Sequence, residues 1–171
     1  MQKRHTDRES YFGEQSQTSK NYYIPYIKEV IGHIPDKVLE VGCGEGGNLL
    51  PFAKAGCRVD IDAMRIEQAR TFFTQRHQQG QFIATDIFQL EDKATNFPLI
   101  LLHDVIEHIK DKERFLSGLQ KHLSADGAVF VGFPAWQMPF GGHQQIAHSH
   151  IVSHFPFLHL LPRTLYRWIL R

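Results

Sequence analysis

Four glycines follow an acidic residue in the segment VLEVGCGEGGNLL, residues 38–50. Gly42, Gly44 and Gly47 fit the spacing G-x-G-x-x-G, which is typical of loops that hold a dinucleotide with its pyrophosphate at a helix N-terminus. Glu40 adds a different constraint, because a carboxylate at the end of the preceding strand repels a pyrophosphate. The same carboxylate favours a cationic ligand such as an ammonium or a sulfonium. The glycines therefore indicate a ligand site, and their spacing alone leaves two kinds of ligand open.

The elements that must position this loop follow from the alternation of short apolar runs and amphipathic stretches. Such alternation predicts an α/β fold with a doubly wound, mostly parallel, Rossmann-like sheet and helices on both faces. Ligands of such sheets bind beyond the carboxyl ends of the strands. Strands are expected at 37–41, 57–61, 81–84, 97–102 and 128–133, and helices at 16–33, 47–56, 63–79 and 111–123. Residues with chemistry are therefore expected at 42–47, 60–62, 85–86, 103–108 and from 133 onward.

Composition narrows the class of partner. The 171 residues suit a single domain, and the formal net charge of +1 provides no field toward nucleic acid or a membrane surface. Two cysteines make no disulfide framework, the N-terminus lacks the apolar stretch of a signal peptide, and no apolar run approaches the ~20 residues of a membrane span. We expect a cytoplasmic protein without nucleic-acid or membrane partners. Composition gives no indication of the oligomeric state.

The segment VLEVGCGEGGNLLPFAKAG resembles motif I of the class I S-adenosylmethionine-dependent methyltransferases. RVDIDAMRIEQAR is similar to the segment of that family whose acidic residue binds the ribose hydroxyls, and FIATDIF to the segment whose aspartate contacts the adenine amino group. Residues 97–134 resemble the fourth strand, helix and fifth strand of small-molecule methyltransferases. The four motifs occur in the family's order over residues 36–134, so the resemblance implies S-adenosylmethionine as the cofactor.

The resemblance also implies roles for individual residues. The methionine moiety would be held by the acid and loop backbone of motif I, that is by Glu40, Gly42, Cys43 and Gly44. Asp86 would accept a hydrogen bond from the adenine amino group, with Ile87 packed on the ring. The alternative for Asp86 is structural, because an aspartate in this position commonly caps a turn. His103 and Asp104, at the end of the fourth strand, would line the pocket of the methyl donor.

The acid for the ribose is ambiguous. The second strand is about three residues shorter than the family pattern, so the usual spacing counted back from the helix reaches Asp60, whereas the strand length fits Asp62 slightly better. We expect one of the two to bind the vicinal diol, and Asp60 is favoured.

A general base is needed only where the acceptor carries a proton that must leave. Candidates near the strand ends are His103, Asp104, His108 and His143. The alternative for HDVIEH is structural, with Asp104 capping the next helix and His108 on the face of that helix. The histidines of 143–154 resemble a metal site in spacing, but no Cys, Asp or Glu completes a set, so no metal is expected.

The chain is expected to divide into three segments. Residues 1–35 form an N-terminal helical lid segment, of which 1–15 are polar and expected to be mobile, and 36–134 form the S-adenosylmethionine-binding α/β core. Residues 135–171 form a substrate-side loop and a C-terminal helix. They offer no pair of strands for the antiparallel hairpin that ends the family fold, so the final antiparallel strands are expected to be lacking.

Three functions fit these patterns. The first is a methyltransferase that acts on a small molecule. The second is a domain that binds S-adenosylmethionine without catalysis or supports a partner subunit. The third, an NAD-dependent oxidoreductase, is disfavoured by Glu40, by the ATD that follows the third strand and by the lack of a constellation for hydride transfer.

Overall fold

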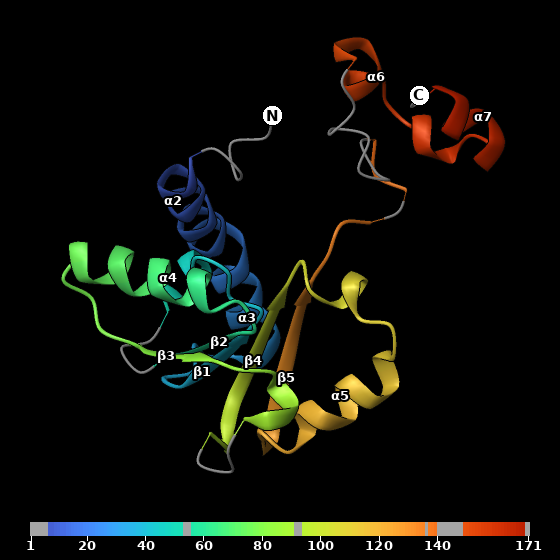
Figure 1. Ribbon diagram of the computed structural model, residues 1–171. Helices are drawn as coiled ribbons and strands as arrows, with labels where there is room; N and C mark the ends of the chain where they lie inside the picture. Colours follow the sequence, from blue (N-terminus) through green and yellow to red (C-terminus); the bar gives the residue numbers. More distant parts are fainter. Residues whose placement is uncertain (1–6, 53–55, 91–93, 136, 140–148, 170–171) are drawn as a thin grey trace. The chain divides into compact units, whose positions relative to one another are not determined.

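The computed structural model describes residues 7–52, 56–90, 94–135, 137–139 and 149–169 (Figure 1). Within it, Asp7–Phe133 form one compact unit, which contains the sheet and the glycine loop. Residues from Pro134 onward belong to a second unit. Among the described residues, no helix is both long and apolar enough to cross a bilayer.

The first unit is built on a five-stranded sheet in the order β3-β2-β1-β4-β5, in which every neighbouring pair is parallel. The central strand β1 pairs Glu40 with Arg58 of β2 on one side and with Leu101 of β4 on the other. The order confirms the predicted Rossmann-like sheet, and the strands lie close to their predicted positions. Their bounds are β1 Val38–Val41, β2 Cys57–Asp60, β3 Gln81–Ala84, β4 Phe97–His103 and β5 Leu123–Gly132.

Helices cover both faces of this sheet (Figure 1). On one face, alternate strand residues such as Val41 and Leu102 pack against Phe115 and Leu119 of α5, Lys112–Gln120. The other face packs against the helices α3, Ile24–Ile31, and α4, Ala63–Gln75. Burial of β1 and β4 on both faces explains why these strands read as continuous apolar runs. The apolar spacing of 111–123 predicts that Leu116 faces inward with Phe115 and Leu119, but Leu116 is exposed.

The N-terminal helical region is longer than predicted. Helix α2 runs over Arg8–Thr18, with Asp7 as its N-cap, and buries Phe12, so residues 8–15 are ordered and the expectation of a mobile segment is wrong there. A π-helical turn, Ser19–Tyr23, then joins α2 to α3. Pro25 lacks the N–H that an α-helix would use, and the wider turn before it lets the helix continue rather than break.

Two local predictions differ from the structure. Where the described residues cover the helix expected over 47–56, they form a 3-10 turn, Gly47–Leu49, followed by another tight turn, because Leu50 and Phe52 donate to carbonyls three residues back. Residues 53–55 of that prediction lie outside the described residues.

Strand β5 begins at Leu123 rather than 128. The sequence Ser-Ala-Asp-Gly at 124–127 predicts a turn, but it is an irregularity within the strand, where Phe97 pairs with Leu123 and Leu99 with Ala128.

The second unit is helical where it is described. It contains a five-residue helix α6, His150–His154, a 3-10 turn, Leu158–Leu160, and helix α7, Arg163–Ile169. The last confirms the helix predicted after Pro162. Its described residues contain no strand.

Candidate cofactor site

Glu40 lies in the middle of the sheet, near the carboxyl end of β1, and is 1% exposed. One carboxylate oxygen accepts a hydrogen bond of 2.9 Å from the side-chain amide of Asn48. The other, Oε2, is buried and has no hydrogen-bond partner among the described residues. A buried carboxylate oxygen without a partner is costly, and a cationic donor that reached it would remove the cost.

Burial is the main electrostatic influence on this residue. It raises the pKa of Glu40 from 4.5 to about 7, against the opposing effects of the Asn48 hydrogen bond and the Arg58 charge. The nearby Asp60 raises the pKa further. Glu40 is therefore poised to change charge near neutral pH, and a bound cation would favour its ionised form.

The backbone N–H groups of the glycine loop are largely used by the protein itself. Gly42 and Cys43 both donate to the carbonyl of Val59, Gly44 donates to the Asp60 carboxylate at 2.8 Å, and Gly46 donates to Cys43. A phosphate-binding loop offers such groups to its ligand. Because these four are already engaged, the loop is poorly suited to a pyrophosphate.

Two glycines are required here by close packing. Gly42 has φ +72°, and a Cβ there would collide with Cγ2 of Val105. Gly47 has no such backbone constraint, but a Cβ there would collide with the carbonyl oxygen of Phe12 in α2. The third glycine of the literal dinucleotide fingerprint thus makes room for the N-terminal helix.

The structure gives Asp60 and Asp62 different surroundings. Asp60 ends β2, is 8% exposed, and accepts N–H bonds from Gly44 and Asp62. The side chain of Asp62 is 47% exposed, caps α4 by accepting from Met64 and Arg65, and lies 3.7 Å from the Arg65 guanidinium. Asp60 touches the glycine loop, whereas Asp62 serves the helix that follows.

Asp86 and Ile87 lie at the carboxyl end of β3. Asp86 caps the 3-10 turn Ile87–Gln89 by accepting from the N–H of Phe88, so the capping role considered for it is present. Ile87 is buried in the core, with its side chain packed between strands and α5. Ile61, which follows Asp60 directly in the sequence, is an apolar residue that is 76% exposed. Ile61 lies within the quoted segment RVDIDAMRIEQAR, but the sequence predicts no role for it; its position at a strand end and its exposure make it a candidate site residue.

At the end of β4, His103 and Asp104 lie next to a tyrosine of the N-terminal helix. The His103 ring is 5.6 Å from that of Tyr23, and its Nε2 is 3.9 Å from the Asp104 carboxylate. Asp104 has φ +54°, which is uncommon for a residue with a side chain and is often found at functional sites. Burial, followed by the charge of Asp104, raises the pKa of Tyr23 to about 12, so this phenol stays protonated at neutral pH.

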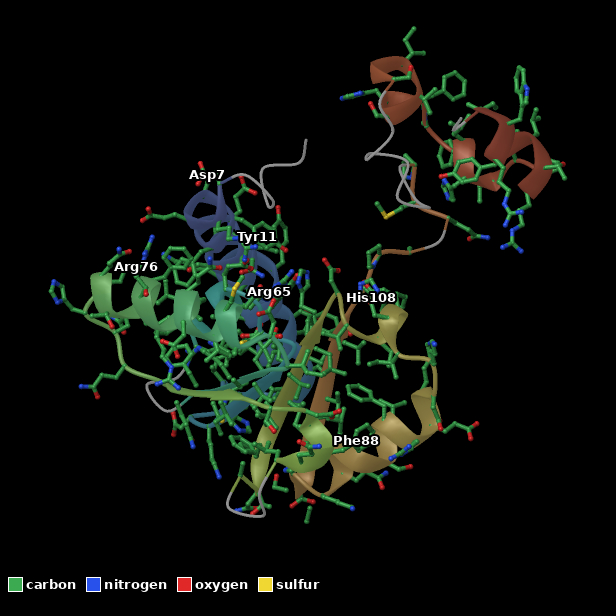
Figure 2. The ribbon with its side chains drawn as sticks, in the orientation of Figure 1. Asp7, Tyr11, Arg65, Arg76, Phe88 and His108 are labelled. Carbon is green, nitrogen blue, oxygen red and sulfur yellow. The ribbon has the colours of Figure 1, made fainter. Side chains whose placement is uncertain are left out.

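The remaining candidates are less favourably placed. His108 lies on the turn after β4 and is 64% exposed at the side chain, with Glu107 4.0 Å away (Figure 2). Asp104 does not cap this turn, whose N-cap is Val105.

Cys43 is buried, which raises the pKa of its thiol, so only its backbone could take part in binding. His143 lies outside the described residues. Over the described ranges, no three His, Cys, Asp or Glu side chains gather as metal ligands would.

The N-terminal helix contacts the glycine loop through residues that no motif indicated. Arg8 forms an ion pair of 3.1 Å with the buried Glu45 and also donates to Gln68 of α4. Ser19, in the π turn, donates to Asn48 at 3.5 Å. Arg65, in the first turn of α4, reaches the same loop at Gly44 (Figure 2). The polarity of the first 20 residues concealed the contacts of Arg8 and Ser19, because their partners lie more than 25 positions away.

An apolar groove of about 590 Å³ lies between α3 and the edge strand β5. Its lining includes Tyr26, Val30, Phe130 and Val131, as well as the Tyr23 that contacts His103, and none of the predicted site residues. The candidate cofactor site is the cluster around Glu40 and Asp60, because the polar groups described above gather there.

Comparison with known proteins places the chain in a family. A family profile described as a methyltransferase domain matches residues 39–129, more than half of the chain. A ubiquinone biosynthesis O-methyltransferase of Bartonella quintana is 32% identical over 118 residues, which cover 64% of this chain and 48% of that relative. A protein of the same name from Rickettsia akari is 30% identical over 98 residues, covering 56% and 39%. The chain spans about half the length, or less, of these curated relatives.

Solved structures agree with this assignment. PKMT2 from Rickettsia typhi, in complex with AdoHcy, superposes with a TM-score of 0.58 and 28% identity over 66% of this chain and 25% of that one. The plantazolicin methyltransferase BpumL, in complex with SAH, has a TM-score of 0.53 and 23% identity over 71% and 45%, a likeness of fold alone. The parallel sheet, the glycine loop at its centre and the matched residues together show that the chain belongs to the methyltransferase domain family.

Proposed function

We propose that this chain binds S-adenosylmethionine at the glycine loop and transfers its methyl group to a small-molecule acceptor. The observation that carries the proposal is Glu40, a buried carboxylate with one unpartnered oxygen directly before the loop. The ligand's α-ammonium group carries a positive charge and the N–H donors that this oxygen lacks. The engaged N–H groups of Gly42, Cys43, Gly44 and Gly46 argue against a pyrophosphate at the same place.

The adenosine part would lie along the carboxyl ends of β2 and β3. Asp60 would accept from the ribose hydroxyls, since a carboxylate has about four acceptor positions and two are used by backbone N–H groups. Ile61 offers exposed apolar surface for the adenine ring, and Asp86 offers the carboxylate that its amino group needs. Ile87 supports this surface from the core rather than facing it.

The chemistry requires orientation more than activation by the protein. The cofactor supplies a methyl group on a positively charged sulfur, which an acceptor atom displaces in line as the carbon–sulfur bond breaks. The chain's part is to hold both reactants in that line and exclude water. Where the acceptor is a hydroxyl, His103 is the best-placed group to take its proton, with Asp104 beside the imidazole to stabilise the cation that forms.

The acceptor is assigned only by chemical class. Curated relatives are named as O-methyltransferases of ubiquinone biosynthesis, which supports a small molecule and an oxygen acceptor here. The R. typhi and BpumL structures, bound to AdoHcy and SAH, support the cofactor.

Ligand-dependent unfolding tests this proposal. S-adenosylmethionine and S-adenosylhomocysteine at about 100 times their Kd should each stabilise the protein by about 2.7 kcal/mol, and NAD should not. Incubation of S-adenosylmethionine with a panel of phenols, followed by mass spectrometry, should then show the gain of one methyl group. Binding without transfer to any acceptor would favour a non-catalytic S-adenosylmethionine-binding domain. Stabilisation by NAD alone would refute the proposal.

A further inference from the structure

Ser19 is a fully buried polar residue that lies outside the part of the chain matched by the family profile. It begins the π-helical turn Ser19–Tyr23, where the carbonyl of Ser19 accepts from the N–H of Ile24, five residues on. Single π turns within α-helices are frequent at functional sites. Here the wider turn brings a hydroxyl against the glycine loop and is followed directly by the Pro25 that it accommodates.

The buried hydroxyl is the first member of a chain of hydrogen bonds that ends at Glu40. Oγ of Ser19 donates to Oδ1 of Asn48 at 3.5 Å, and Nδ2 of Asn48 donates to Oε1 of Glu40 at 2.9 Å. All three side chains are at most 1% exposed. Oε2 of Glu40, at the end of these hydrogen bonds, is then left without a partner among the described residues.

Hydrogen bonds at both ends hold the side-chain amide of Asn48. A carboxamide has a donor end and an acceptor end, and the Glu40 carboxylate, which only accepts, takes the N–H₂ end. The Ser19 hydroxyl then satisfies the buried amide oxygen at the opposite end. Without that hydroxyl the oxygen has no partner, and the amide is held less firmly against Glu40.

We propose that Ser19 is a positioning residue that acts through Asn48 to orient Glu40 toward the ammonium group of the ligand. The N-terminal helix is thereby part of the amine subsite, although it touches the carboxylate only through the loop. This inference rests on the proposed function of Glu40 and adds to it the residues that hold the carboxylate.

Two ligands separate such a role from a general loss of structure. S-adenosylhomocysteine carries the α-ammonium group, whereas 5′-methylthioadenosine has the same adenosine and thioether without the amino acid. Titration calorimetry of Ser19→Ala should show about 3- to 10-fold weaker binding of S-adenosylhomocysteine, as expected for one lost neutral hydrogen bond. Binding of 5′-methylthioadenosine should change by less than about twofold. Ser16→Ala, on the same helix but outside the chain of hydrogen bonds, is the control and should match the wild type for both.

The pH dependence gives a second readout. A less firmly held Asn48 donor makes Glu40 harder to ionise, so the pH below which S-adenosylhomocysteine affinity declines should rise in Ser19→Ala by about half a unit. Asn48→Asp places a second carboxyl group against Glu40. It should shift this pH further upward and weaken S-adenosylhomocysteine at least about tenfold, with a smaller effect on 5′-methylthioadenosine.

The outcomes are distinct. Equal weakening of both ligands by Ser19→Ala, or no weakening of either, overturns the positioning role while leaving the proposed function intact. Should Ser19→Ala fail to fold, the ligand selectivity of Asn48→Asp decides in the same way. A wild-type protein that binds neither ligand overturns the proposed function and this inference together.

Discussion

Replacing Glu40 by glutamine should stabilise the free protein and weaken ligand binding. Glutamine keeps the size of the side chain and an oxygen that can accept from Asn48, but it carries no charge. The free protein gains because a buried carboxylate with an unpartnered oxygen disappears. Binding loses because the charge that we assign to the ligand's ammonium group disappears with it.

The magnitude follows from the shift in pKa. Glu40 has a folded pKa of about 7 against 4.5 for its ordinary value, so the folded state holds its proton more tightly than the unfolded state. Below pH 4.5 the group is protonated in both states and contributes no difference. As the pH rises from 4.5 to about 7, the group ionises in the unfolded chain but stays largely protonated in the folded protein, so the stability of the wild type falls. Glu40→Gln escapes this loss, so its stability relative to the wild type should increase by about 2.5 kcal/mol between pH 5 and pH 8.

Urea denaturation of the free proteins at pH 5 and pH 8 measures this difference, and titration calorimetry with S-adenosylhomocysteine measures binding. At pH 8 the variant should bind about 10- to 150-fold more weakly, the range for a lost hydrogen bond to a charged group. Glu45→Gln is a matched control, because Glu45 is also buried in the loop but is paired with Arg8. Its substitution should destabilise the protein or leave it unchanged at pH 8. A Glu40→Gln protein with wild-type affinity and no pH-dependent gain in stability would refute the reasoning.

Other substitutions test the packing of the loop and the assignment of the ribose acid. Gly42→Ala should cost about 2–4 kcal/mol in urea denaturation, because its φ is positive and a Cβ would collide with Val105; Gly13→Ala, on the open face of α2, should instead stabilise by about 0.5–1 kcal/mol. Equal effects at the two glycines would contradict this account of Gly42. Asp60→Asn should weaken S-adenosylhomocysteine and 5′-methylthioadenosine alike, by about tenfold or more in calorimetry, because both carry the ribose. Asp62→Ala should remove only a helix cap, at about 0.5–2 kcal/mol of stability with near-normal affinities, and the reverse ranking would assign the ribose to Asp62.

Much of the sheet could be predicted because its signal is local. The strands of the core are short apolar runs bounded by glycine, aspartate or histidine, and their parallel order follows from the helices between them. The bounds of β3 agree with the prediction, and β1 and β4 agree to within one residue. The type and position of Glu40 predict it as a site residue, and the structure adds that one of its oxygens lacks a partner among the described residues.

The differences arise where distant contacts decide local structure. Residues 8–15 are polar in sequence, yet they form a helix because Phe12 packs into the core and Arg8 pairs with Glu45. Near the end of the glycine loop, the buried Arg58 guanidinium donates to the carbonyls of Leu49 and Gly56, contacts that no local pattern around 47–56 could indicate. The short second strand leaves both Asp60 and Asp62 open, with Asp60 favoured, and the structure gives them different surroundings: Asp60 is buried and accepts from Gly44, whereas Asp62 caps α4.

The most direct test of the central claim is a crystal structure of the protein with S-adenosylhomocysteine. The account predicts that the α-ammonium nitrogen lies at hydrogen-bond distance, about 3 Å, from Oε2 of Glu40, with the ribose hydroxyls on Asp60. A ligand whose amino group lies away from Glu40, or whose ribose contacts Asp62 instead, would contradict it.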